Sequence, residues 1–152
     1  MAEDRVERTV VIAATAERVW EVLTKPEHIG NWFGPGTPTA VDLQPGGVVV
    51  LEPPGSGERY LARVVTVDPP HYFAYRWASA YPEVLADETN STLVEFRLTA
   101  EEAKTRLTVS ESGFASLKIP AGREHFSSYE SHSEGWTEIV RILADYAEQN
   151  AP

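Results

Sequence analysis

The sequence contains no cysteine. Such a chain forms no disulfide, offers no thiolate nucleophile and has no sulfur ligands for zinc or an iron–sulfur cluster, which fits a reducing compartment. Basic residues are also scarce, because 13 Lys and Arg stand against 23 Asp and Glu, and the formal net charge is −10. This charge repels phosphate backbones and anionic lipid headgroups, so we expect neither nucleic acid nor a membrane surface as a partner.

Long hydrophobic runs are missing as well. The N-terminal residues MAEDRVERT are polar, and no run approaches the roughly 20 apolar residues that a membrane-spanning helix needs. We therefore expect a cytoplasmic location. The 152 residues are a common size for one domain, and the chain shows no linker, repeat or charge block, so we predict a single domain over residues 1–152.

The apolar residues that are present recur in an orderly series of patterns. Residues 6–13 are rich in β-branched types and predict a strand, after which Thr15 caps a predicted helix that Pro26 ends. A second short helix is expected over residues 27–31. Short runs with period-two alternation then predict six strands, over residues 39–43, 48–52, 59–67, 71–77, 91–98 and 105–112. The chain closes with one long predicted helix over residues 127–149.

This order predicts an α+β fold, in which the long helix covers one face of an antiparallel sheet. The segments 81–89 and 114–126 are expected to be loops, and Pro45-Gly46-Gly47 a turn or bulge. A strongly twisted sheet and a straight helix do not match everywhere, so a gap is expected between them. Exposed strand edges in an incompletely closed sheet also permit a homodimer.

Five stretches resemble, in order, motifs of a known family: RVWEVLTKPEHIGNWFGP, DLQPGGVVV, VVTVDPPHYFAYRW, TRLTVSESGF and EGWTEIVRIL. They look like the single-domain bacterial type of the family named for activators of the heat-shock-protein-90 ATPase, within the START-like (SRPBCC) superfamily. The resemblance implies a helix-grip fold, a curved antiparallel sheet wrapped around a long C-terminal helix with two short helices after the first strand. That superfamily includes lipid carriers, hormone receptors, aromatic polyketide cyclases and co-chaperone domains, so the fold alone leaves the function open.

The expected gap has a set of candidate ligand-binding residues. Trp32 and Phe33 follow the two short helices, where they either fasten a corner of the core or line the mouth of a cavity. Phe73, Tyr75 and Trp77 share one strand face, which is either plain core or cavity wall. The full set of candidates is Trp32, Phe33, Tyr60, Tyr75, Trp77, Phe96, Glu111, Phe114, Trp136, Ile139, Val140 and Leu143.

Glu111 is the most informative single candidate. In TRLTVSES the inward phase is Leu107, Val109 and Glu111, which turns a carboxylate toward the helix. A buried carboxylate must pair, accept hydrogen bonds or shift its pKa, so the simpler interpretation is a solvated strand end. If it faces a cavity, Glu111 could orient a polar ligand or act as a general acid or base beside Tyr60 or Arg63. Glu95 and Arg97, on the outer phase of their strand, are expected to stay in water.

Other chemical motifs are weak. His125 and His132 lie seven residues apart among acidic residues, but a solvated helix start explains them better than a metal site. His28 and His71 are expected at the surface. Ser127 and Ser128 lack a G-x-S-x-G context, and the glycine-rich turns lack the lysine of a phosphate loop, so neither a nucleophilic hydrolase nor a nucleotide-binding site is expected. We expect no metal and no cofactor.

Three functions are compatible with these residues. The first is a non-enzymatic binder of a small hydrophobic or aromatic molecule in a cavity between the sheet and the long helix. The second is an enzyme of the cyclase or dehydratase type on an aromatic polyketide-like substrate, with Glu111 as its catalytic residue. The third is a co-chaperone-like module with a filled interior, a chaperone partner and a role in the stress response. A cavity separates the first two from the third.

Overall fold

The first strand and helix form where the residue types favour them. The strand β1 covers Arg5–Ile12, and Thr15 then caps the helix α1, Ala16–Thr24, by accepting a hydrogen bond from the backbone N–H of Arg18. The short helix α2, Pro26–Ile29, follows. The computed structural model describes residues 5–29, 32, 38–52, 57–122 and 128–149.

The rest of the described chain alternates short strands and turns before the final helix. Its elements are β2 Pro38–Val41, β3 Val48–Leu51, β4 Tyr60–Asp68, β5 Tyr72–Trp77, β6 Thr92–Glu101, β7 Lys104–Ser112, the 3-10 helix η1 Phe114–Ser116 and α4 Tyr129–Gln149. The six strands after α1 were predicted within a few residues. The β6–β7 turn is shorter than expected, and η1 lies inside a segment predicted as a loop.

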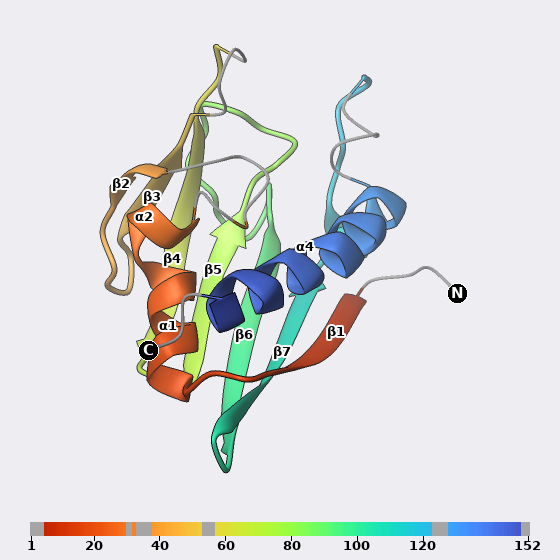
Figure 1. Ribbon diagram of the computed structural model, residues 1–152. Helices are drawn as coiled ribbons and strands as arrows, with labels where there is room; N and C mark the ends of the chain where they lie inside the picture. Colours follow the sequence, from red (N-terminus) through yellow and green to blue (C-terminus); the bar gives the residue numbers. More distant parts are fainter. Residues whose placement is uncertain (1–4, 30–31, 33–37, 53–56, 123–127, 150–152) are drawn as a thin grey trace.

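All seven strands join one antiparallel sheet in the order β1-β7-β6-β5-β4-β3-β2. The helices lie on one side of this sheet: α4 crosses in front of β5, β6 and β7, while α1 and α2 stand beside β3 and β4 (Figure 1). The end of α4 reaches α2, because the Tyr146 hydroxyl lies 2.6 Å from Nδ1 of His28. This is the α+β arrangement that the sequence pattern predicts and the helix-grip fold that the family resemblance implies.

The core between sheet and helices centres on Phe96 of β6. Its ring is stacked on Phe73 and meets Trp32 and Trp136 edge to face, with centroids about 6 Å apart. The inner phases of β6 and β7 are buried as predicted, including Leu107. Burial of a large apolar side chain contributes roughly 1.5–3 kcal/mol, so this aromatic cluster fastens three elements to one another.

The Pro45-Gly46-Gly47 stretch is a turn, as expected, and it needs both glycines. Gly46 has a φ of 86°, and a Cβ on Gly47 would lie 2.1 Å from the backbone oxygen of Asp42. The N–H of Gly46 donates to the backbone oxygen of Val64 on β4, and the N–H of Val64 donates to the backbone oxygen of Gly47, both at 2.8 Å. The turn therefore fixes the β2–β3 hairpin against β4.

The expectation that Glu95 stays in water is wrong. Glu95 lies on the outer face of β6, yet its carboxylate is covered and accepts hydrogen bonds from the Tyr72 hydroxyl at 2.5 Å and from Arg97 at 2.9 Å. Burial opposes ionisation of Glu95, but the bond from Tyr72 and the charge of Arg97 outweigh it and lower the pKa of that carboxyl. Burial and the bond to Glu95 raise the pKa of Tyr72 to about 12.

Candidate functional site

An apolar pocket lies between the helix pair α1–α2 and the strands β2 to β5. It contains about 400 Å³ of empty space when its opening to solvent is included. The residues that line it are Leu23, Thr24, Ile29, Trp32, Val41, Leu43, Val49, Leu51, Ala62, Phe73 and Tyr75. None of these side chains carries a charge at neutral pH, so the pocket suits an uncharged, apolar molecule.

The helix side of the pocket is built so that its polar atoms are already paired. The Thr24 hydroxyl donates to the backbone oxygen of Trp20 at 2.8 Å, one turn earlier in α1. The indole Nε1–H of Trp32 donates to the backbone oxygen of Val22 at 2.7 Å. Because these bonds hold both side chains in place, their apolar surfaces form a preformed wall.

The sequence left open whether Trp32 fastens the core or lines a pocket, and its side chain does both. Its ring packs edge to face on Phe96, with centroids 6.0 Å apart, and the same side chain lines the pocket. It is therefore part of the core and part of the pocket wall. Phe33, the other candidate of this pair, lies outside the described residues.

Glu111 does not sit at a solvated strand end, so the simpler interpretation of its position is wrong. Its side chain is completely buried on the inner face of β7. Three donors converge on the carboxylate: Thr92 Oγ1 at 2.5 Å, Trp136 Nε1 at 2.8 Å, and His132 Nδ1 at 2.7 Å from Oε1 and 2.8 Å from Oε2. The carboxylate is buried without solvent because these donors replace water.

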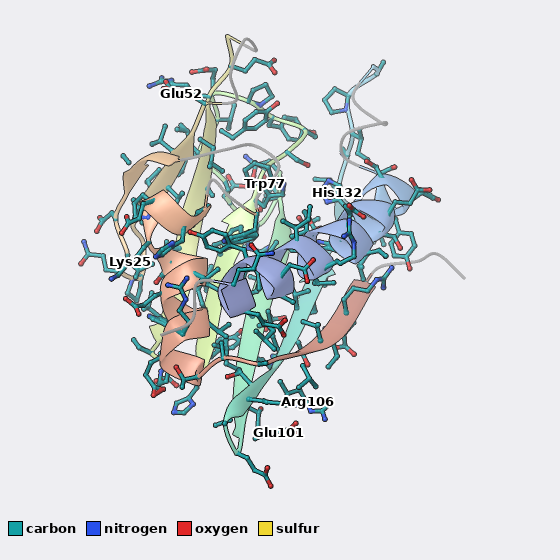
Figure 2. The ribbon with its side chains drawn as sticks, viewed as in Figure 1. Lys25, Glu52, Trp77, Glu101, Arg106 and His132 are labelled. Atoms are coloured by element: carbon teal, nitrogen blue, oxygen red, sulfur yellow. The ribbon has the colours of Figure 1, made fainter. Side chains whose placement is uncertain are left out.

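His132 likewise is not part of a solvated helix start. It lies near the beginning of α4 (Figure 2), and its side chain faces the sheet, because its Nδ1 is bonded to Glu111 on β7. Its Nε2 lies 3.4 Å from Oγ of Ser79, and its ring meets Phe114 edge to face at 5.4 Å. The tertiary fold thus places a histidine between a carboxylate and a serine.

Tyr75 lies between the apolar pocket and the Glu111 cluster. It lines the pocket and packs against Phe73 and Phe96. Burial and, to a smaller extent, the charge of Glu111 raise the pKa of Tyr75, so its hydroxyl stays protonated. Within the described residues this hydroxyl has no hydrogen-bond partner.

The other candidates lie outside the pocket lining. Tyr60 packs on Trp77 at 5.4 Å and donates its hydroxyl to Glu58, so it does not reach Glu111. The remaining candidates belong to the core or to its edge: Phe96, Phe114, Trp136 and Leu143 are buried, and Ile139 and Val140 are partly buried. The predicted face of α4 is therefore core, and the pocket lies farther toward α1 and α2.

Most residues that line the pocket were not predicted from the sequence, because they are ordinary aliphatic side chains. Val49, Leu51 and Ala62 come from alternating strands, a pattern that indicates burial but does not distinguish a packed wall from a hollow one. Leu23 and Ile29 come from the short helices, where the same limit applies. Only the packing of α1 and α2 against the β2–β4 strands shows which apolar residues border empty space.

The remaining histidines give no metal site in the described part of the chain, where no group of three His, Cys, Asp or Glu side chains could hold an ion. His71 is exposed as expected, whereas His28 is half-buried against Tyr146. His125 lies outside the described residues. Among the described helices, none is long and apolar enough to cross a membrane.

Comparisons with known proteins agree with this architecture. Residues 13–148 match the model of the family described as Activator of Hsp90 ATPase homolog 1-like protein. Among curated proteins, none shows significant similarity. DynU16, a protein from the dynemicin biosynthetic locus, is 25% identical with a TM-score of 0.71, and the match covers 99% of this chain and 49% of DynU16. The chain therefore spans about half the length of that relative.

Two further solved structures share the fold. NE0264 from Nitrosomonas europaea is 22% identical with a TM-score of 0.71, and the match covers 98% of this chain and 97% of NE0264. The Aha1 dimer from Colwellia psychrerythraea is 18% identical with a TM-score of 0.67, and the match covers 97% of each chain. At these identities the likeness concerns the fold alone.

Proposed function

The chain belongs to the Activator of Hsp90 ATPase homolog 1-like family, within the START-like helix-grip superfamily, and we propose that it binds a small hydrophobic or aromatic molecule. The observation that carries the proposal is the apolar pocket beneath α1 and α2. The described side chains that line it are uncharged, and the polar atoms of Thr24 and Trp32 are paired with backbone oxygens. Such a site gains free energy mainly by removing apolar surface from water.

The dimensions and chemistry of the pocket limit the ligand. Much of the 400 Å³ lies in the opening, so the enclosed part is small and a ligand would place only part of its apolar surface there. A charged group is unfavourable there, because no described lining side chain could pair with it. The Tyr75 hydroxyl is the one lining group in the described pocket that is left to donate a hydrogen bond to a neutral ligand oxygen.

The two alternative functions have less support from the geometry. A cyclase-type enzyme needs an acid or base that faces the pocket, yet the oxygens of Glu111 are bound by Thr92, His132 and Trp136. A chaperone-interaction module needs no cavity, whereas this fold has one between its helix pair and its sheet.

The experiment that tests binding uses naphthalene and 2-naphthol as probes. We expect both to raise the unfolding temperature in a concentration-dependent way and to shift the amide NMR signals of Leu51 and Ala62. Ala62→Val fills the pocket from β4 and should weaken binding several-fold. Ala74→Val, the same change at a buried alanine of β5 whose side chain lies on the other face of the sheet, should bind as the wild type does.

Either of two results would contradict the proposal. One is the absence of any thermal or NMR shift across the soluble range of both probes. The other is equal loss of binding in both valine variants, which would show that the probes report general stability rather than occupancy of the pocket. Native mass spectrometry of the purified protein would then show whether a natural ligand of another class is retained.

We also propose that the chain forms a homodimer through a sheet edge. Both β1 and β2 are edge strands and have only one strand neighbour in the described sheet, and β1 is the longer of the two. A second copy could pair with the free side of β1. Sedimentation velocity over a wide concentration range tests this, with Val11→Pro as the variant expected to remain monomeric.

A further inference from the structure

Ser79, His132 and Glu111 form a chain of polar side chains at the beginning of α4. His132 Nδ1 lies 2.7 Å from Oε1 of Glu111, and His132 Nε2 lies 3.4 Å from Oγ of Ser79. Ser79 follows the end of β5, Glu111 is on β7 and His132 is on α4, so three separate elements supply the three groups. An ordered nucleophile, base and carboxylate are the parts of a nucleophilic acyl-transfer site.

The contacts determine which nitrogen of His132 carries hydrogen. An ionised carboxylate can only accept, so Nδ1 donates its hydrogen to Glu111. In the neutral ring this leaves the lone pair on Nε2, on the side of the Ser79 hydroxyl. The serine–histidine separation is longer than a tight hydrogen bond, as is common for such pairs before a substrate is bound.

The carboxylate and the imidazole are both held from other directions. Trp136 and Thr92 donate to Glu111 at 2.8 and 2.5 Å, and Glu111 itself is fully buried. Phe114 packs edge to face on the imidazole, with ring centroids 5.4 Å apart. A fixed ring with a defined tautomer is what a general base requires, and these contacts supply both.

A backbone donor lies next to the serine in the chain. The N–H of Ala80 has no acceptor among the described residues, although Ala80 is buried. Buried backbone N–H groups without a partner are rare. In nucleophile turns of hydrolases, the N–H of the residue after the nucleophile stabilises the oxyanion that forms during attack.

We propose that Ser79, His132 and Glu111 form an acyl-transfer site that cleaves small, uncharged esters. Ser79 Oγ bonds to the ester carbonyl carbon, its proton passes to His132 Nε2, and the Ala80 N–H donates to the oxyanion. The bond to the alcohol then breaks, and the alcohol leaves with the proton from His132. A water molecule attacks the acyl-serine in the same way and releases a carboxylic acid.

This activity goes beyond the proposed ligand binding, because its groups lie outside the lining of the apolar pocket. Ser79 is 7% exposed and the His132 side chain 11%, so only a narrow acyl group can reach the hydroxyl. The nearby charge of Glu111 and the net charge of −10 disfavour anionic esters. Ser79 and His132 are the proposed catalytic residues, and Glu111 positions His132.

The direct test is covalent labelling of the whole protein with a small alkyl fluorophosphonate, read by intact mass and peptide mapping. We expect one adduct on Ser79, absent in Ser79→Ala and strongly slowed in His132→Gln. Ser110→Ala is the matched control, because Ser110 is also buried near a carboxylate, that of Glu95, and should leave the adduct unchanged.

Turnover of p-nitrophenyl acetate tests the positioning by Glu111. In Glu111→Gln we expect kcat to fall by about 10²–10⁴-fold with little change in KM, and in Glu111→Asp part of the loss to be restored. Circular dichroism of each variant confirms that it is folded. A folded wild type that takes no fluorophosphonate on Ser79, or an adduct that persists in His132→Gln at the wild-type rate, would overturn the proposal whether or not the apolar pocket binds naphthol.

Discussion

Trp136 on α4 donates its indole Nε1–H to Oε1 of Glu111 on β7, 2.8 Å away and shielded from solvent. This bond joins the long helix to the concave face of the sheet through a polar contact inside an otherwise apolar core. A carboxylate in that position is tolerated because two more donors, from Thr92 and His132, complete its coordination. The bond from Trp136 therefore helps to orient α4, and it also holds Glu111, which in turn orients His132.

Removal of the indole donor should destabilise the protein even when the aromatic ring is retained. Trp136→Phe leaves Glu111 with one donor fewer in a buried site, and we expect the free energy of unfolding to fall by about 1–3 kcal/mol. Urea denaturation measures it. Trp20→Phe, at a partly buried indole with no indole hydrogen bond in the described structure, is the control. An equal loss in both variants would contradict a specific contribution from the bond to Glu111.

The indole hydrogen bond and the ring of Trp32 should make separate contributions to stability. Trp32→Phe keeps a ring against Phe96 but loses the bond to the backbone of Val22, so we expect a loss of about 1 kcal/mol. Trp32→Ala also removes the ring and should cost about 3–5 kcal/mol. Thermal and urea unfolding measure both. Similar values for the two variants would show that the ring adds nothing to the core.

The Tyr72–Glu95 pair predicts a pH-dependent contribution to stability. The pKa of Glu95 is lowered in the folded protein, so its contribution is present above the unfolded value of about 4.3 and is lost as the pH falls through the lower folded value. We expect Tyr72→Phe to lower the unfolding temperature at pH 7 and to differ progressively less from the wild type below about pH 4.

Tyr81→Phe is the control for this pH dependence. The Tyr81 hydroxyl bonds the backbone oxygen of Lys118 rather than a carboxylate, so its effect should not change over the same acidic range. Thermal unfolding of the three proteins at several pH values measures the difference. A Tyr72→Phe effect that stays constant into acid would show that the charge of Glu95 contributes nothing to the pair.

Two glycines should respond in opposite directions to the same substitution. Gly47→Ala places a Cβ 2.1 Å from the Asp42 oxygen and should destabilise the β2–β3 hairpin by at least about 1–3 kcal/mol. Gly135 lies in α4 with open space where a Cβ would stand, so Gly135→Ala should stabilise the helix by about 0.5–1 kcal/mol. Urea denaturation tests both, and a stable Gly47→Ala protein would contradict the close approach.

The local sequence pattern was sufficient to predict the order of the helices and strands. The Thr15 cap, the Pro26 stop and the alternation in residues 91–98 are read within one segment, because capping and side-chain alternation depend on neighbours in sequence. The inward phase of Glu111 was also predicted in this way. Its burial was not, because solvent access depends on α4, which begins some distance farther along the chain.

The sequence by itself therefore determined the α+β class, the strand faces and the long helix, since hydrophobic periodicity is a local property. Only the tertiary structure decided that Glu111 meets His132 and Ser79, and that the hollow space lies under α1 and α2 rather than along α4. Both outcomes depend on which distant segments pack together and how completely they fill the space between them. Periodicity specifies which side of an element is apolar, but not what lies opposite it.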